Sequence, residues 1–479
     1  MSSVRRIAVN TLSLGIAEIV AKVAQFIIFV YVARQLGNVI FGRFNFAYSY
    51  SLKAVIFADI GINYMIIREL SRKKELLNKF ISNSFLIKTA LGTVIFILSV
   101  VVLNAFNYPK ETRILVYLFL VYMFLRSNTE LLFSVFKAFE KMHYEALIKS
   151  LGIFLILILG IYSLMFAKNI IFLGFLYVLV ELSVFLVTLA VITTKFVRIK
   201  LEADFAFIKK IIKLAFPFTL AVIFSGVYFY IDTIMLSFMK GDVPVGIYSA
   251  SYNITLALLF IPSMYTFAIY PILSSGYDKF KKKVNFIYER SFKYLYMLGL
   301  PISIGLFIIA RNIILFVYGQ NYSSSIIALK ILAWFVLFKF LSYLTGIVLS
   351  SINVQKYRTY SQGAAAFLNL GLNLILIPKY SFIGAGIATL ISEIALFVLT
   401  FAFVYRHFHA FNVLEILYKP LIASAIMAGA IIFLKLNMFL VIAIGAFVYF
   451  AALLLLRAFD EKDYSLMKKL IKIGNPDKR

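Results

Sequence analysis

Long apolar runs, separated by short clusters of charged residues, Gly, Pro or Asn, fill the 479-residue chain almost from end to end. A helix needs about 20 apolar residues to cross the hydrocarbon core of a bilayer, and backbone groups in lipid must hydrogen-bond within the chain. The pattern therefore predicts an all-α polytopic membrane protein with about 14 transmembrane helices. The predicted spans are 8–33, 44–67, 80–103, 114–136, 145–167, 170–193, 211–238, 246–272, 290–310, 326–350, 359–377, 382–405, 415–434 and 437–457.

Lysine and arginine set the predicted orientation. If the N-terminus lies in the cytoplasm, most of the 48 basic residues fall in cytoplasmic loops, as the positive-inside rule requires. Both termini are then cytoplasmic, and we expect a multi-pass protein of the cell membrane. The same basic clusters favour contacts with anionic membrane lipids, so the net charge of +27 does not indicate a nucleic-acid partner. The tail at 464–472 has the pattern of a short interfacial helix.

Several kinds of chemistry are excluded by the composition and by the short loops. The absence of Cys excludes disulfides, thiolate metal sites and cysteine nucleophiles. No P-loop motif is present, and no loop between spans is long enough to hold a catalytic domain. His407 and His409 alone do not make a zinc site. The sequence thus predicts a protein that is not an enzyme and that has no catalytic residues, metal or cofactor.

The chain also contains a faint internal repeat. Residues 36–52 align with 240–256, and residues 174–190 align with 386–402, at similar separations of about 204 and 212 residues. The matched pairs include Gly37 with Gly241, Gly42 with Gly246, Tyr48 with Tyr252, and Glu181 with Glu393.

The repeat predicts two lobes. Because each copy covers six helices, an even number, both copies begin in the cytoplasm and form parallel repeats about an axis along the membrane normal. The expected domains are an N-terminal six-helix lobe at 1–205 and a C-terminal six-helix lobe at 206–408. Two extra helices and a basic cytoplasmic tail then occupy 409–479. This is a transporter architecture, with a substrate site between the lobes and alternating access to it.

Three segments carry a resemblance to a known family. They are ARQLGNVIFGRFNFAYSY (33–50), FADIGINYMIIREL (57–70) and FPFTLAVIFSGVYFYIDTIMLS (216–237). Together they resemble the polysaccharide biosynthesis and export family, which includes the O-antigen flippases and belongs to the multidrug/oligosaccharidyl-lipid/polysaccharide exporter superfamily. The resemblance implies two lobes around a lumen and the flipping of lipid-linked sugars from the inner to the outer leaflet. Asp59, Gly61 and Asp232 are motif positions without an assigned role.

Eleven charged residues lie inside the predicted spans and away from their ends, where each costs at least about 2.5–3.5 kcal/mol if it faces lipid. Most must therefore face a lumen or one another. Arg126 and Lys339 lie near the middle of the fourth and tenth spans, 213 residues apart, and we expect them to face each other and bind a substrate phosphate. The alternative for Arg126 is a structural ion pair with Glu130, one turn away. Further candidates for binding phosphate are Lys22, Lys53 and Lys88.

The buried acids are candidates for ion coupling or gating, because a desolvated carboxylate can titrate near physiological pH or bind Na⁺. Glu18 is also spaced to pair with Lys22. For Glu181 and Glu393 the alternative is a polar contact within the lobe of each. The complete set is Asp59, Asp232, Glu18, Glu130, Glu181 and Glu393.

Three functions compete. The first is a flippase that moves lipid-linked oligosaccharide or polysaccharide precursors to the outer leaflet by alternating access. Its partners would be the lipid-linked sugar, membrane lipids, H⁺ or Na⁺, and glycosyltransferases of the same pathway. The second is a cation-coupled multidrug exporter of the same superfamily, for which a more acidic lumen would be expected. The third, a membrane sugar polymerase, is disfavoured because such enzymes need a large outer loop.

Overall fold

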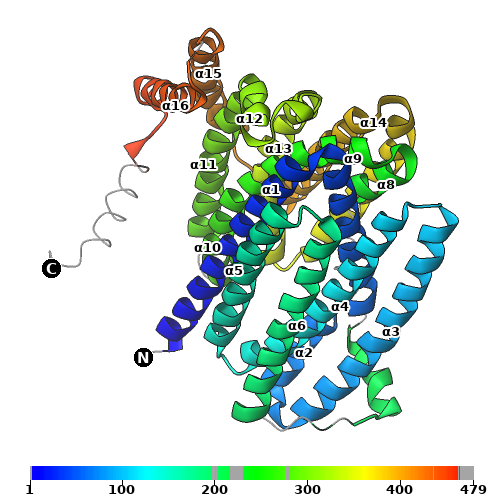
Figure 1. Cartoon of the computed structure of the whole chain (residues 1–479). Helices are drawn as coiled ribbons and strands as arrows, with labels where there is room; N and C mark the ends of the chain where they lie inside the picture. Colours follow the sequence, from blue (N-terminus) through cyan, green and yellow to red (C-terminus); the bar gives the residue numbers. More distant parts are fainter. Residues whose placement is uncertain are drawn as a thin grey trace. The chain divides into compact units, whose positions relative to one another are not determined.

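The computed structural model describes residues 3–196, 200, 202–215, 230–276, 281–434, 436–461 and 463, and the regular structure in these ranges is entirely helical (Figure 1). The helices are α1 (Ser3–Asp59), α2 (Ile62–Arg72), α3 (Leu77–Ala105), α4 (Lys110–Ala138), α5 (Met142–Phe166), α6 (Ile170–Lys195), α8 (Ile231–Lys240), α9 (Asp242–Leu258), α10 (Phe260–Gly276), α11 (Lys281–Ile308), α12 (Ala310–Val317), α13 (Ser325–Ser351), α14 (Gln355–His407), α15 (Val413–Ile432) and α16 (Met438–Leu455). Two short 3₁₀ helices lie at Lys74–Leu76 and Gln320–Tyr322.

The predicted membrane spans fall on these helices. Within the described ranges, 11 helical segments are long and apolar enough to cross a membrane. Helices α1 and α14 each contain two predicted spans, joined at non-helical residues Gly37 and Ser381. The seventh span is only partly covered, because 216–229 lie outside the described residues, as does the predicted tail helix at 464–472. The prediction of an all-α, multi-pass membrane protein is confirmed.

Several predicted spans are interrupted, and the break in one of them lies at residues with positive φ. The span at 44–67 contains two consecutive residues with positive φ, Ile60 (35°) and Gly61 (67°), so α1 ends at Asp59 and α2 begins at Ile62. A left-handed residue cannot continue a right-handed helix. Hydropathy does not detect such a break, because the residues on both sides remain apolar.

Helix ends recur at matched positions in the two halves of the sequence. Eight of the twelve described residues with positive φ form four pairs in which the second follows the first by 204 to 213 residues: Gly37 and Gly241, Asn107 and Gly319, Glu140 and Asn353, and Lys168 and Ser381. Gly37 (φ 77°, ψ 178°) and Gly241 (φ 82°, ψ −166°) share a conformation that is essentially restricted to glycine. These pairs support the proposal that the two halves repeat one helical plan.

The described helices group into two compact units. The first unit comprises Met1–Phe260, Val317–Ala328 and Thr359–Ser392, and the second comprises Ile261–Phe316, Leu329–Arg358 and Glu393–Arg479. In the first unit, helices α4, α5 and α6 pack side by side (Figure 1). In the second unit, α15 packs against α16 and α11, and the Tyr449 hydroxyl donates a 2.6 Å hydrogen bond to the Met297 carbonyl.

Two matched glycines let α1 and α9 cross with their backbones in contact. A Cβ atom added at Gly42 would overlap the carbonyl of Asp242, and one added at Gly246 would overlap the carbonyl of Asn38. Both obstacles are backbone atoms, so a rotamer change cannot relieve the clash. The crossing therefore requires glycine at both positions.

We expect Gly42→Ala to destabilise the protein by about 1–3 kcal/mol or more, because overpacking here must separate two helices. The measurement is the midpoint of thermal unfolding in detergent. Gly429→Ala is the matched control, since no heavy atom lies within 4 Å of its added Cβ. Equal midpoints for the two variants would contradict the close crossing.

Asp463, beyond the last apolar helix, is fully buried and bonds to the N-terminal half of α11. Its carboxylate accepts bonds from Lys293 Nζ (2.5 Å), the Tyr294 hydroxyl (2.6 Å) and Arg290 Nη1 (3.0 Å). It also accepts from the backbone N–H of Asp460 at 2.9 Å. Burial by itself raises the pKa of Asp463, but the bonds from Lys293, Tyr294 and Asp460 outweigh it, so the pKa lies below its ordinary value.

Because the folded pKa of Asp463 is lowered, its stabilisation is complete above the unfolded value of about 3.9 and is lost as pH falls through the folded value. Asp463→Asn should cost about 1–3 kcal/mol at neutral pH. The difference in thermal midpoint between variant and wild type should stay constant above about pH 5 and shrink below pH 4. A difference that does not change with acidification would refute the ionised role of Asp463.

Candidate functional site

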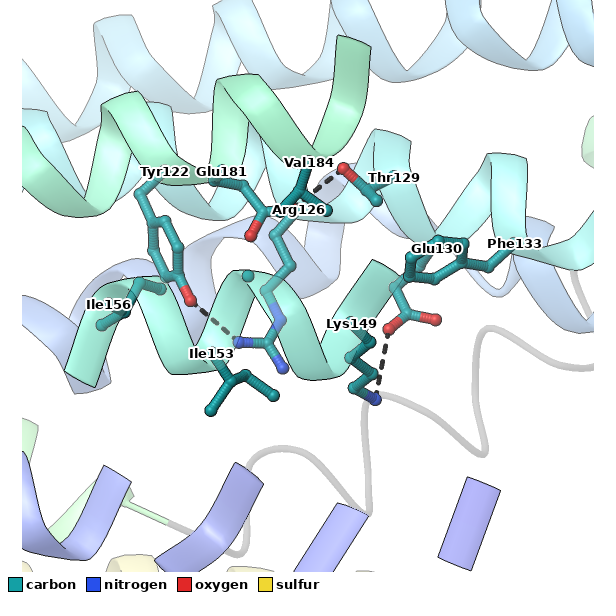
Figure 2. A pocket seen from close by; sticks show the side chains of 11 residues that line it. Tyr122, Arg126, Thr129, Glu130, Phe133, Lys149, Ile153, Ile156, Glu181 and Val184 are labelled. Carbon is teal, nitrogen blue, oxygen red and sulfur yellow. Dashed lines mark hydrogen bonds and ion pairs between the residues drawn. The ribbon is translucent and has the colours of Figure 1, made fainter. Parts of the chain in front are cut away.

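A small cavity lies between α4, α5 and α6 in the first unit (Figure 2). Its volume is about 40 Å³, which is room for a few water molecules. It is lined by Tyr122, Arg126, Thr129, Glu130, Phe133, Lys149, Gly152, Ile153, Ile156, Glu181 and Val184. Three of the charged residues predicted from the sequence thus meet in one pocket, together with a lysine that was not predicted.

Arg126 is the central cation of this pocket. Its Nη1 donates a 2.9 Å hydrogen bond to the Tyr122 hydroxyl, one turn earlier on α4, and Figure 2 shows the guanidinium turned toward that ring. Among the described residues, no carboxylate oxygen lies within 4.0 Å of the guanidinium. A guanidinium has five N–H donors, so Arg126 retains donors for an oxyanion.

The two acids of the pocket bind other groups. Glu181 accepts a 2.9 Å hydrogen bond from the Thr129 hydroxyl. Glu130, the expected partner of Arg126, lies 3.6 Å from Lys137 Nζ and 3.8 Å from Lys149 Nζ.

Glu18 and Lys22 lie in the N-terminal part of α1. Glu18 forms a 2.9 Å ion pair with Lys149 of α5, so its cation comes from another helix. The side chain of Lys22 is exposed. Lys53, further along α1, lies over the ring of Tyr230 with its Nζ 5.3 Å from the ring centre.

Lys339 lies in the second unit, in an equivalent setting on α13. Its Nζ is 2.9 Å from Glu393 Oε2, and the Ser342 hydroxyl donates to the other oxygen of the same carboxylate. The ammonium also lies 5.8 Å from the ring centre of Phe335 and 5.7 Å from that of Tyr343. Lys339 is 5% exposed and Glu393 is fully buried.

The two sites are built on one plan. In each, a cation is followed three residues later by a hydroxyl that donates to the Glu at the matched repeat position: Thr129 to Glu181 and Ser342 to Glu393. The Arg126 site and the Lys339 site differ in the partner of the cation. Lys339 is ion-paired with its Glu, whereas Arg126 is more than 4.0 Å from Glu181 and hydrogen-bonds a tyrosine instead.

Lys88 and Asp59 form a buried ion pair at the break between α1 and α2. Lys88 is 1% exposed, and its Nζ is 2.6 Å from Asp59 Oδ1. The ammonium also donates to Asn63 Oδ1 (2.9 Å) and to the Ser127 carbonyl (2.7 Å). All three donors of the ammonium are thus satisfied, which favours a structural role for Lys88 in this conformation.

Asp232, at the start of α8, is a buried acid with neutral partners. It is 1% exposed and accepts from Asn373 Nδ2 (2.5 Å), the Thr389 hydroxyl (2.8 Å) and the Tyr248 hydroxyl (3.1 Å). No basic nitrogen of the described residues lies within 4.0 Å of it. Asn373 Oδ1 is buried without a hydrogen-bond partner. A carboxylate and an amide oxygen together suit a proton or a small hard cation.

Polar contacts join the two halves of the sequence on the side predicted to face outward. We call this set, formed by Arg34, Arg43, Asp242 and Tyr322, the outer gate. Arg43 Nε lies 2.9 Å from Asp242, and Arg43 also pairs with Glu111. Arg34 Nε donates to the Val317 carbonyl at 2.7 Å, and the Tyr322 hydroxyl donates to the Ala33 carbonyl at 3.1 Å. All these residues belong to the first unit.

Comparison with known proteins identifies the family. The profile described as polysaccharide biosynthesis protein matches residues 7–276, more than half of the chain. The chain belongs to this family.

Two relatives of this chain carry transporter names. The probable flippase AglR of Haloferax volcanii is 30% identical over 169 residues, which cover 34% of this chain and 35% of AglR. The candidate O-antigen transporter of Escherichia coli is 24% identical over 370 residues, which cover 76% of this chain and 88% of that protein. The chain thus spans about a third of AglR but most of the second relative.

Solved structures share the fold of this family member. The lipid II flippase MurJ, in an inward closed conformation, matches with a TM-score of 0.76 and 18% identity, over 91% of this chain and 97% of MurJ. An inward-facing MATE multidrug transporter matches with a TM-score of 0.63 and 15% identity, over 81% and 95%. At these identities the matches establish the fold alone.

Sequence reasoning missed several polar residues of these sites. Lys149 lies close to the predicted boundary of the fifth span and was not counted among its buried charges. Asn373 and Thr389 are uncharged, and only their presence within apolar spans could have marked them. Arg43 was assigned to a loop, and its partner Asp242 is 199 residues away.

Proposed function

We propose that this protein flips a lipid-linked oligosaccharide or polysaccharide precursor from the cytoplasmic to the outer leaflet. The observation that carries the proposal is Arg126, a membrane-embedded guanidinium that lines a cavity and has no carboxylate within 4.0 Å among the described residues. Such a lipid carries a phosphate or diphosphate, which needs a counter-charge in a medium of low dielectric constant. The family and the names of its relatives support the same substrate class.

In this proposal, Arg126 is the main phosphate site within the membrane and binds through parallel hydrogen bonds. Lys339 serves as a second phosphate site, but only when it leaves Glu393, since the two now form an ion pair. Lys22 and Lys53 are secondary sites. Lys88 becomes available only if the Asp59 pair opens.

Asp232 is the proposed coupling site, binding H⁺ or Na⁺. Its neutral partners leave a buried negative charge without a counter-ion, a costly arrangement that protonation or a bound cation relieves. Asp59, Glu18, Glu130 and Glu393 are less suited to this role here because each has a cationic partner.

We further propose that residues 1–205 and 206–408 act as lobes that alternate access to the substrate, with 409–479 outside them and both termini in the cytoplasm. Reporter fusions after Arg113 and Lys240 should report the outer side, and a fusion after Lys283 the inner side. An inner signal at Lys240 would overturn this topology.

The main alternative is a cation-coupled multidrug exporter, which the shared fold of a MATE transporter permits. We favour the flippase because a drug cation would be repelled by Arg126, which lines the pocket and has no carboxylate within 4.0 Å among the described residues. A sugar polymerase is a weaker alternative, and we propose that the protein is not an enzyme.

The deciding experiment is a flipping assay in proteoliposomes. The purified protein is supplied with candidate lipid-linked sugars on one side, with and without Na⁺ and pH gradients, alongside a cationic drug. Movement of a lipid-linked sugar, but not of the drug, supports the proposal. Transport of the drug alone would establish the exporter.

A further inference from the structure

Just beyond the C-terminal end of α13 lies a second arginine that has no carboxylate oxygen within 4.0 Å among the described residues. Arg358, in the first turn of α14, is partly buried, and its Nη1 donates a 3.0 Å hydrogen bond to the Ser350 hydroxyl. The guanidinium lies along Gly346, where an added Cβ would be 3.5 Å from Nε. Among the described residues, no carboxylate oxygen lies within 4.0 Å of Arg358.

The internal repeat allows the surroundings of Arg358 to be compared with the equivalent positions in the first half of the sequence. The matched helix breaks at Glu140 and Asn353 set the register, 213 residues apart, between α4–α5 and α13–α14. In this register Ser350 corresponds to Lys137, and Arg358 corresponds to Glu145. Lys137 and Glu145 form an ion pair of 3.0 Å.

Relative to the first half, the second half therefore has the cation Arg358 where the first has the anion Glu145. It has the neutral Ser350 where the first has the cation Lys137. The first half places Glu130 within 3.6 Å of Lys137, whereas the matching residue of the second half is the neutral Tyr343. A cluster of one lysine and two glutamates is thus replaced by an arginine beside a hydroxyl. Because the first turn of α14 contains no acid, the helix dipole also adds to the positive potential here.

One face of α13 runs from the neighbourhood of Arg358 to the buried Lys339, and we call it the α13 stripe. Lys339, Tyr343, Gly346 and Ser350 follow one another at spacings of three or four residues along α13, so they share one face. Lys339 and Ser350 are about 16 Å apart along the helix axis. The Tyr343 ring lies beside Lys339, with the ammonium nitrogen 5.7 Å from the ring centre.

We propose that Arg358 binds a phosphate group of a membrane lipid, and that this is the first anion site met by the lipid-linked substrate on its way from the cytoplasm. The proposal rests on the proposed function and on the predicted orientation, which places this end of α13 in the cytoplasm. The Ser350 hydroxyl holds the guanidinium, and the phosphate supplies the negative charge that Glu145 and Glu130 supply in the first half. From there, the α13 stripe leads toward Lys339.

The test measures binding of inorganic pyrophosphate to the purified full chain by calorimetry. All samples carry Arg126→Ala, so that Arg126 does not compete with Arg358 for pyrophosphate. Arg358→Gln should weaken binding about tenfold or more. Ser350→Asp should do the same while keeping the thermal midpoint, because it gives Arg358 a resident carboxylate. Arg406→Gln, an exposed arginine in the last turn of α14, is the control and should bind as the parent does. Parent-like binding by both Arg358→Gln and Ser350→Asp would overturn the proposal.

Two further arms separate the possible sources of the phosphate. In the flipping assay, Arg358→Gln should raise the half-saturating concentration of lipid-linked sugar about tenfold and leave the maximal rate nearly unchanged. If phosphatidylglycerol in nanodiscs displaces pyrophosphate from Arg358, and flipping does not change in Arg358→Gln, the occupant is a phospholipid headgroup and the substrate assignment fails. If no lipid-linked sugar is flipped by the wild type but pyrophosphate binding still depends on Arg358, the site stands and the proposed function fails.

Discussion

Replacing Arg126 with Ala should slow the flipping of a lipid-linked sugar about ten- to hundredfold, because the substrate phosphate then loses its charge-assisted hydrogen bonds. Arg126→Lys should retain part of the rate, since an ammonium keeps the charge but not the planar pair of donors. The measurement is the flipping rate in proteoliposomes, with protein incorporation checked in each sample.

The control for Arg126 separates substrate binding from structure. If the arginine only balances Glu130, then joint replacement of Arg126 and Glu130 by Gln should restore activity that Arg126→Ala loses. Lys339→Arg should remain active, and neutralising both cations should nearly abolish flipping. Wild-type rates for both single neutralisations, Arg126→Ala and Lys339→Ala, would exclude both as phosphate sites and direct attention to Lys22, Lys53 and Lys88.

Asp232→Asn should abolish the response of flipping to an ion gradient. The carboxylate is buried among neutral donors, so its charge is balanced only by a bound cation or removed by a proton. The amide variant retains the shape but cannot exchange either ion. The gradient-driven rate should fall about tenfold or more, toward the rate without a gradient.

Asp204→Asn is the matched control, because Asp204 lies outside the apolar helices and pairs with Lys79 at 2.6 Å. It should respond to the gradient as the wild type does. Loss of the Na⁺ response alone identifies Na⁺ as the coupling ion, and loss of the pH response alone identifies H⁺. A full gradient response in Asp232→Asn would exclude this residue from coupling.

The apolar pattern predicted the helices well because the bilayer requires both length and hydrophobicity in each span. The matched glycines Gly37 and Gly241 were visible in the sequence, and both adopt the same positive-φ conformation. The break at Ile60 and Gly61 was not predicted, since a change in backbone dihedral leaves no trace in hydropathy.

The partners of the buried charges were harder to predict. Spacing along one helix suggested Lys22 for Glu18, but the ion pair is made with Lys149, 131 residues away. Arg358 was missed because it lies in a predicted loop, outside the spans searched for buried charges. Such pairings depend on which helices pack together, and the sequence carries that information only through its faint repeat.

The outer gate has a consequence for the conditions in which the protein works. The Arg43 pairs with Asp242 and Glu111 are partly exposed, so dissolved ions screen them over a Debye length of about 8–10 Å at moderate salt concentration. The backbone packing at Gly42 and Gly246 involves no charged groups, so its strength does not depend on salt concentration. The free energy of these contacts therefore contains one part that ionic strength weakens and one part that it leaves intact. In the proposed alternating-access cycle, separation of the two halves at these contacts would therefore require less free energy in brine than in fresh water.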